Sequence, residues 1–133
     1  MKWILKANAT IQELQNDFRQ LFSHLKIEFY KAPHSSDEGS SQKEQYLHNI
    51  ILADILGVDK DIELEVDPKM STGDFEMMLE DSHQLHTQIF RLQRGTWLQS
   101  TLSDAMSLES QNQKGMDADS HTESIKASDF DLE

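Results

Sequence analysis

The sequence contains no cysteine, which excludes disulfide bonds, thiolate nucleophiles and zinc sites that use cysteine. Its five glycines never form the G-x-G-x-x-G or G-x-x-x-x-G-K patterns, so the loops that bind dinucleotide or nucleotide phosphates are absent. No apolar run is long enough to span a bilayer, and lysines interrupt the N-terminal stretch too early for a signal peptide. We therefore expect a cytoplasmic protein that does not contact membranes.

Basic residues are scarce, because 12 Lys and Arg stand against 24 Asp and Glu and leave a net charge of −12. A field of this sign repels phosphate backbones and anionic lipids, so we expect no nucleic acid partner. Only 37% of the 133 residues are hydrophobic, and the mean hydropathy is −0.62. These values predict that part of the chain stays outside the folded core.

Periodicity in the first third of the chain predicts a strand, a helix and a second strand. Residues 2–7 alternate in the two-residue pattern of a strand. Thr10 and Glu13 form a capping box, which marks the start of a helix. An apolar stripe at helical spacing follows, made of Ile11, Leu14, Phe18, Leu21, Phe22 and Leu25. Residues 26–31 alternate again, which predicts the second strand.

The middle of the chain predicts a loop, an inserted helix and a third strand. Residues 34–45 are dominated by serine, glycine and charged side chains, which is typical of a mobile loop. Between residues 46 and 56 apolar side chains recur at helical spacing, and Gly57 is a natural stop. We expect a helix of about three to four turns there. Residues 62–66 alternate between apolar and acidic side chains, which predicts a third strand.

The chain also contains a weak internal repeat. Residues 71–79 align with residues 10–18, and each stretch has a helix N-cap followed by an apolar stripe. After a one-residue deletion, residues 85–91 align with residues 25–31. Two β-α-β halves predict an α+β fold with a split β-α-β, ferredoxin-like sheet of about five strands, an inserted helix and a short C-terminal helix. A β-grasp-like arrangement is the alternative.

β-Branched and aromatic runs flank Arg94-Gly95, which predicts a β-hairpin. A two-residue turn at this position pairs Leu92 with Trp97. We expect the second strand of the hairpin to reach residue 102.

The end of the chain predicts a short helix and a tail. Ser107 can cap one or two helical turns that end near Gly115. Residues 116–133 then hold six acids and one lysine. We therefore expect a single domain over residues 1–115 and an acidic disordered tail over residues 116–133.

Short motifs follow one another from the hairpin onward: Thr87-Gln88-Ile89-Phe90-Arg91, Gly95, Trp97-Leu98, Thr101, Asp104, Ser107-Leu108-Glu109 and Gln111-Asn112. In this order they resemble a group of small uncharacterised bacterial proteins with V-Q-V-F-R, G, W-L-x-T-T and T-L-E-x-Q-N runs. The resemblance implies one ordered unit of hairpin and helix, and it transfers no catalytic residue.

Side chains capable of chemistry are present without a recognisable arrangement. His83 and His86 are close in the sequence, but such a pair binds zinc or nickel only with a third ligand, and surface histidines are the simpler interpretation. Acids between residues 59 and 65 alternate into a strand, where they discourage edge-to-edge aggregation. We therefore expect no catalytic residue, no metal and no cofactor.

The strongest candidate site is an apolar patch on one face of the sheet. If the two repeated helices cover the other face, this face shows Ile4, Tyr30, Phe90, Leu92 and Trp97. A patch of this kind is not left in water without a reason. Either the inserted helix or the segment around Leu108 covers it, or it binds another molecule.

Two functions follow from these observations. The first is a non-catalytic protein-interaction or assembly module, whose sheet binds a protein partner or a second copy while the acidic tail modulates the contact. The second is a small-ligand-binding or enzymatic domain with a pocket between the sheet and the inserted helix, where carboxylates and His48 are the available chemistry. A filled core beside residues 46–55 would remove the second function.

Overall fold

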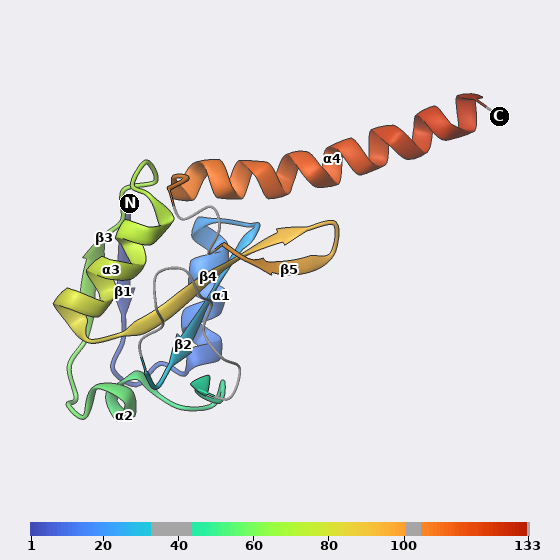
Figure 1. Cartoon of the computed structure of the whole chain (residues 1–133). Coiled ribbons are helices and arrows are strands. Elements are labelled where there is room, and N and C mark those ends of the chain that lie inside the picture. The colour runs from blue at the N-terminus through green and yellow to red at the C-terminus, as the bar shows by residue number, and fades with distance from the viewer. Residues whose placement is uncertain (33–43, 101–104, 133) are drawn as a thin grey trace.

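The computed structural model describes residues 1–32, 44–100 and 105–132, with side chains up to residue 120. Over these residues the chain is an α+β protein with five strands and four helices (Figure 1). In chain order they are β1 (Lys2–Leu5), α1 (Ile11–Leu21), β2 (Leu25–Tyr30), α2 (Leu52–Leu56), β3 (Ile62–Glu65), α3 (Thr72–His83), β4 (His86–Gln93), β5 (Thr96–Gln99) and α4 (Leu108–Leu132).

The strands form two antiparallel sheets instead of the single sheet predicted from the sequence. β1 pairs with β3, while β2, β4 and β5 form a three-stranded sheet in that order. The predicted α+β class is confirmed, and the connectivity is compatible with a split β-α-β fold. Both helical connections have the same form, because α1 and α3 each lead from the two-stranded sheet to the three-stranded one.

Buried side chains occupy the strand edges that a single continuous sheet would need. Gln15 Nε2 in α1 donates a 2.7 Å hydrogen bond to the carbonyl of Ile27 in β2. On β4, the amide of Ile89 donates to Glu76 Oε2 of α3 at 2.7 Å. Because these backbone groups already have hydrogen-bond partners, β1 cannot pair with β2 or β4 at these positions.

α1 begins as predicted and supplies the centre of the core. Glu13 N donates to Thr10 Oγ1, and Thr10 N donates to Glu13 Oε1, each at 3.1 Å, so the capping box is complete. Phe18 is fully buried, and its ring centroid lies 5.4 to 5.9 Å from those of Trp3, Phe22 and Phe75. Six apolar residues of β1 to β4 belong to the same buried core, namely Trp3, Leu5, Ile27, Phe29, Leu64 and Ile89.

The helix ends differ from the sequence prediction at two places. α1 stops at Leu21, so Leu25 begins β2 instead of continuing the helical stripe. The expected helix over residues 46–56 is reduced to α2 alone. The residues before α2 form tertiary backbone bonds, since Tyr46 N donates to the carbonyl of Phe29.

Most of the predicted mobile loop, residues 34–43, lies outside the described residues. Its last two residues, Glu44 and Gln45, contact the end of β2. Lys31 N donates to the carbonyl of Glu44, and Gln45 forms a bridge with Tyr30.

The strand register confirms the repeat. Glu28 lies opposite Gln88 in the β2–β4 ladder, and the repeat aligns these same two residues with each other. The first aligned stretch matches residue 10 with residue 71. The same spacing in the sequence aligns Trp3 with Leu64, and these two residues are also partners in the β1–β3 ladder. A residue that pairs with its own counterpart lies on a local two-fold axis, so the halves of the chain are related by an internal pseudo-two-fold rotation.

The repeat extends to α2 and α4. Leu52, the first residue of α2, donates its amide to the carbonyl of Ala9 at 2.9 Å. Leu108, the first residue of α4, donates its amide to the carbonyl of Met70 at 3.0 Å. Both leucines are fully buried. α2 is therefore the counterpart of the first turns of α4, and it is not a helix inserted between two shorter repeats.

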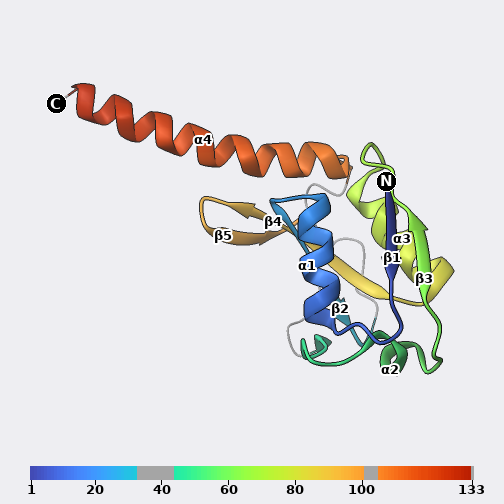
Figure 2. The ribbon, with the colours of Figure 1, turned by 180° about the vertical axis from the view of Figure 1, so that it is seen from behind.

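α4 does not end near Gly115 as predicted, and the backbone of residues 116–132 is helical where a disordered tail was expected. Gly115 permits a close crossing: a Cβ there would lie 2.5 Å from the carbonyl oxygen of Leu92 and 2.9 Å from Cβ of His24. The C-terminal half of α4 projects away from the other elements in both views (Figures 1 and 2).

Candidate functional site

The β4–β5 hairpin has the predicted geometry. Arg94 and Gly95 have φ angles of 53° and 78°, the positive values that a type I′ turn requires at both central residues. This turn pairs Leu92 with Trp97, as expected. β5 ends at Gln99, and residues 101 and 102 of the longer strand expected from the sequence lie outside the described residues.

Two cations contact the aromatic side chains of this hairpin. Arg19 Cζ and Lys26 Nζ each lie 5.0 Å from the Trp97 ring centroid. Lys26 Nζ also lies 4.9 Å from the Phe90 ring centroid. Phe90, Leu92 and Trp97 share one face of the hairpin and are half-buried, while Arg19 is exposed. We call Arg19, Lys26, Phe90, Leu92 and Trp97 the aromatic–basic surface.

Tyr30 does not contribute to this surface, although the sequence placed it there. It is only 2% exposed, and its burial raises the pKa of its hydroxyl, an effect that the charge of Glu28 reinforces. Ile4 is exposed but belongs to the separate two-stranded sheet. The apolar part of the patch is therefore confined to the hairpin.

α4 lies on the face of the hairpin opposite Trp97. Arg91 alternates with Phe90 and so points to the other side of β4. Arg91 Nη1 donates to Gln111 Oε1 of α4 at 2.6 Å, and Leu108 is buried in the core. The segment around Leu108 therefore does not cover Trp97.

The charges of the aromatic–basic surface are incompletely neutralised. Lys26 Nζ lies 3.5 Å from Glu28 Oε2, a buried carboxylate that also contacts His48 Nε2 at 3.2 Å. Arg19 donates to the carbonyl of Ser23, and no acidic side chain in the described part of the chain forms an ion pair with it. Arg19 thus adds an exposed positive charge to a chain that is strongly negative overall.

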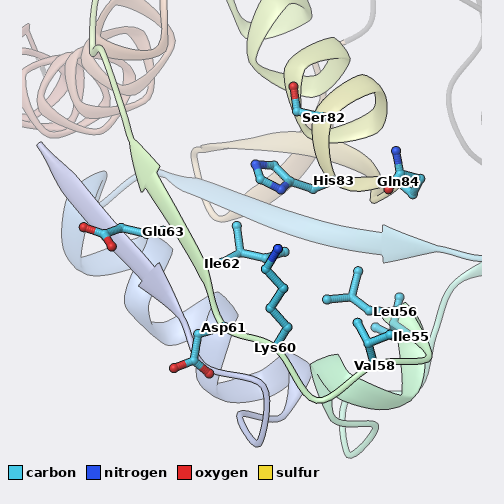
Figure 3. A pocket seen from close by; sticks show the side chains of 10 residues that line it. All are labelled: Ile55, Leu56, Val58, Lys60, Asp61, Ile62, Glu63, Ser82, His83 and Gln84. Carbon is cyan, nitrogen blue, oxygen red and sulfur yellow. The ribbon is translucent and has the colours of Figure 1, made fainter.

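A pocket of about 650 Å³ lies where α2, β3 and the end of α3 meet (Figure 3). Ile55, Leu56, Val58 and Ile62 form its apolar part. Its polar lining is Lys60, Asp61, Glu63, Ser82, His83 and Gln84. A smaller hollow of about 290 Å³ is lined by Gln45, Tyr46, Leu47 and His48. The space between α2 and the neighbouring strand is thus not filled by the core.

The acidic and the basic side chains of the larger pocket differ in their partners. Glu63 Oε1 lies 2.6 Å from Lys2 Nζ, and this hydrogen-bonded contact lowers the pKa of Glu63. Asp61 accepts a 2.7 Å hydrogen bond from Ala7 N, which lowers the pKa of Asp61. Both carboxylates therefore bind groups at or after β1. The side chains of Lys60 and His83 form no hydrogen bond or ion pair within the described residues.

The histidines considered from the sequence do not come together. His83 ends α3, His86 Nδ1 contacts Glu80 Oε1 at 2.8 Å, and His48 contacts Glu28. In the described ranges no group of three or more His, Asp and Glu side chains is placed to hold a metal ion. Nor does any helix there combine the length and apolar composition needed to cross a bilayer.

Sequence patterns did not identify three residues of these sites. Arg19 lies on the polar side of α1, Lys26 alternates with core residues in β2, and Lys60 lies in a turn-like stretch. Only the three-dimensional arrangement brings Arg19 to Trp97 and Lys60 to the pocket beside α2. No protein-family model matches the chain, and neither a curated protein nor a solved structure matches it.

Proposed function

We propose that this protein is a non-catalytic assembly module that binds a second copy of itself through the aromatic–basic surface. The observation that carries the proposal is the contact of Trp97 with Arg19 and Lys26, each at 5.0 Å from the ring centroid. Tryptophan and arginine are enriched among the residues that dominate binding energy at protein interfaces. A half-buried tryptophan with an adjacent exposed guanidinium offers both an apolar anchor and a charge.

Charge complementarity supports a second copy as the occupant. Residues 116–133 carry six acids and one lysine, opposite in sign to Arg19 and Lys26. α4 leaves the domain on the face away from Trp97, and its C-terminal half projects outward (Figure 2). Asp119 binds His24 of its own chain, but beyond this residue α4 is directed away from its own aromatic–basic surface, and we propose that it is available to that of another copy.

Sedimentation velocity over a range of protein concentrations tests this proposal. We expect the wild type to dimerise, and raising the salt from about 0.1 M to about 1 M should weaken the dimer because the Debye length shortens from roughly 10 Å to roughly 3 Å. Trp97→Ser and Arg19→Glu should each abolish dimerisation. Lys69→Glu is the matched control, because Lys69 is an exposed lysine outside the surface and should leave the dimer intact.

A mixing experiment separates the two sides of the contact. Trp97→Ser lacks the anchor but keeps the acidic segment, and a chain truncated after Asp119 keeps the surface but lacks most of that segment. Neither should self-associate, whereas their mixture should form a one-to-one complex. A wild type that stays monomeric at every concentration contradicts the proposal. So does a dimer that tolerates both changes, because its interface would then lie elsewhere.

Binding of a small ligand is a second candidate function. It is favoured by one observation, the pocket of about 650 Å³ beside α2, whose size falls in the range of known ligand sites. The pocket lies between α2 and β3. An enzymatic role would need a catalytic arrangement in addition to this pocket.

We further propose a cytoplasmic location and no role in binding nucleic acids or membranes. The net charge of −12 supports both exclusions, since phosphate groups on either partner would be repelled. A ferredoxin-like fold, with a β-grasp-like fold as the alternative, and kinship with the small bacterial proteins that share the hairpin motifs are also proposals. The two equivalent β-α-β halves support the first of these.

A further inference from the structure

We infer that the pocket between α2, β3 and the end of α3 binds a small organic anion with an apolar body. The inference rests on the second candidate function and goes beyond it by naming the chemistry of the ligand. It is independent of the aromatic–basic surface, which is formed by α1, β2 and the β4–β5 hairpin.

The internal two-fold explains why this space is open. Because Leu52 corresponds to Leu108 in the repeat, residues 55–59 correspond to residues 111–115 of α4. In the second half that stretch is helical and packs on His24, whose amide donates to Asn112 Oδ1 at 2.7 Å. In the first half α2 ends at Leu56, and Gly57 has the left-handed φ of 75° that stops the helix. The pocket therefore occupies the place that α4 fills on the other side of the axis.

The counterpart of His24 supports this assignment. The repeat aligns His24 with Gln84, and Gln84 lines the pocket. A residue that α4 covers in one half thus faces open space in the other. Exposed Val58, at 56%, adds apolar surface that no helix covers.

The electrostatics of the pocket select an anion. Asp61 and Glu63 are directed toward β1, away from Lys60 and His83 (Figure 3), and both are already bound to groups of the N-terminal segment. The side chain of Lys60 extends toward that of His83, and neither side chain forms a hydrogen bond or ion pair within the described residues. A carboxylate placed between them would gain the charge-assisted hydrogen bonds that both side chains lack.

The apolar part of the pocket selects the rest of the ligand. Ile55, Leu56 and Val58 project from one short stretch, and Ile62 lies behind Lys60 (Figure 3). A hydrocarbon body would remove the exposed parts of Ile55, Leu56 and Val58 from water while its acid group meets Lys60. A small, fully polar anion such as inorganic phosphate would leave this surface wet.

Titration of the ¹⁵N-labelled full chain with octanoate tests the inference, with 1-octanol and octylammonium as matched probes. We expect octanoate to shift the amide signals of residues 55–62 and 82–84 in a saturable manner. Lys60→Met keeps most of the side-chain stem and removes the charge, and we expect it to weaken octanoate binding about tenfold, as loss of one charge-assisted hydrogen bond does. Lys69→Met is the control and should leave the affinity unchanged.

The three probes separate failure of this inference from failure of the candidate function. If 1-octanol binds as tightly as octanoate, or octylammonium binds more tightly, the pocket is a ligand site but its preference for anions is wrong. If no probe shifts the amides of residues 55–62 and 82–84, both the inference and the ligand-binding function fall. Equal affinities of wild type and Lys60→Met for octanoate would also overturn the assignment of the anion to Lys60.

Discussion

Glu28 lies directly opposite Gln88 in the β2–β4 ladder, and each is the counterpart of the other in the internal repeat. Trp3 and Leu64 have the same relationship in the second sheet. Two self-paired positions define one axis, so each sheet is built across the boundary between the halves. Neither half can therefore complete either of these ladders alone.

The two-fold also relates Gln15 to Glu76, and their opposite hydrogen-bonding roles give the first prediction. Gln15 donates to a carbonyl, whereas Glu76 accepts from an amide. Glu76→Gln keeps an acceptor oxygen and should change the free energy of unfolding by less than about 1 kcal/mol. Gln15→Glu places a buried carboxylate against a carbonyl oxygen and should cost at least about 2 kcal/mol. Urea unfolding of both variants measures the difference, and equal costs would contradict the proposed roles.

The second prediction concerns Phe18, the aromatic centre of the core. Phe18→Ala should lower the free energy of unfolding by roughly 3–5 kcal/mol, because it removes a fully buried ring that contacts three others. Met77→Ala is the control, since Met77 is 59% exposed on α3 and should change stability by less than about 0.5 kcal/mol. An unchanged urea midpoint for Phe18→Ala would place the buried face of α1 elsewhere.

Local sequence signals predicted the elements that local interactions build. The capping box at Thr10 and the Arg94-Gly95 turn act over a few residues, and both form as expected. The repeat was visible for the same reason, because caps and apolar stripes recur with a fixed spacing. The sequence therefore predicted α1, α3, the hairpin and the Leu92–Trp97 pair.

Tertiary contacts override the local signals where the prediction is wrong. Residues 46–51 have helical periodicity, but backbone bonds to β2 and α1 hold them in an irregular path. Glycine often ends a helix, but Gly115 lies inside α4, where the absence of a side chain lets α4 cross close to Leu92. Tyr30 alternates onto the expected open face, but it is buried there. Each of these outcomes depends on a partner distant in the sequence, which periodicity does not reveal.

The third prediction concerns pH and Tyr30. Burial raises the pKa of Tyr30 above the ordinary value of 10.0, and the charge of Glu28 raises it further. A group with a raised pKa in the folded state contributes stability that is complete below the unfolded pKa and is lost as pH rises toward the folded value. The wild type should therefore lose stability above about pH 10, and Tyr30→Phe should lose less. Urea midpoints of both proteins on either side of pH 10 test this, and parallel losses would show that Tyr30 does not titrate as expected.

The last prediction concerns Gly115, where two effects of opposite sign compete. Glycine in a helix interior is usually less favourable than alanine by about 1 kcal/mol, so Gly115→Ala would ordinarily stabilise the protein. Here the new Cβ would lie 2.5 Å from the carbonyl oxygen of Leu92 and 2.9 Å from Cβ of His24. Neither atom is the flexible end of a side chain, so α4 must move.

Movement of α4 would strain or break the bonds from Arg91 to Gln111 and from the His24 amide to Asn112. We therefore expect Gly115→Ala to destabilise the chain by about 1–3 kcal/mol, the usual cost of overpacking. Gln113→Ala, at an exposed position two residues earlier, should have little effect. Thermal and urea unfolding decide the sign. Stabilisation by Gly115→Ala would mean that helix propensity dominates and that α4 does not cross β4 this closely.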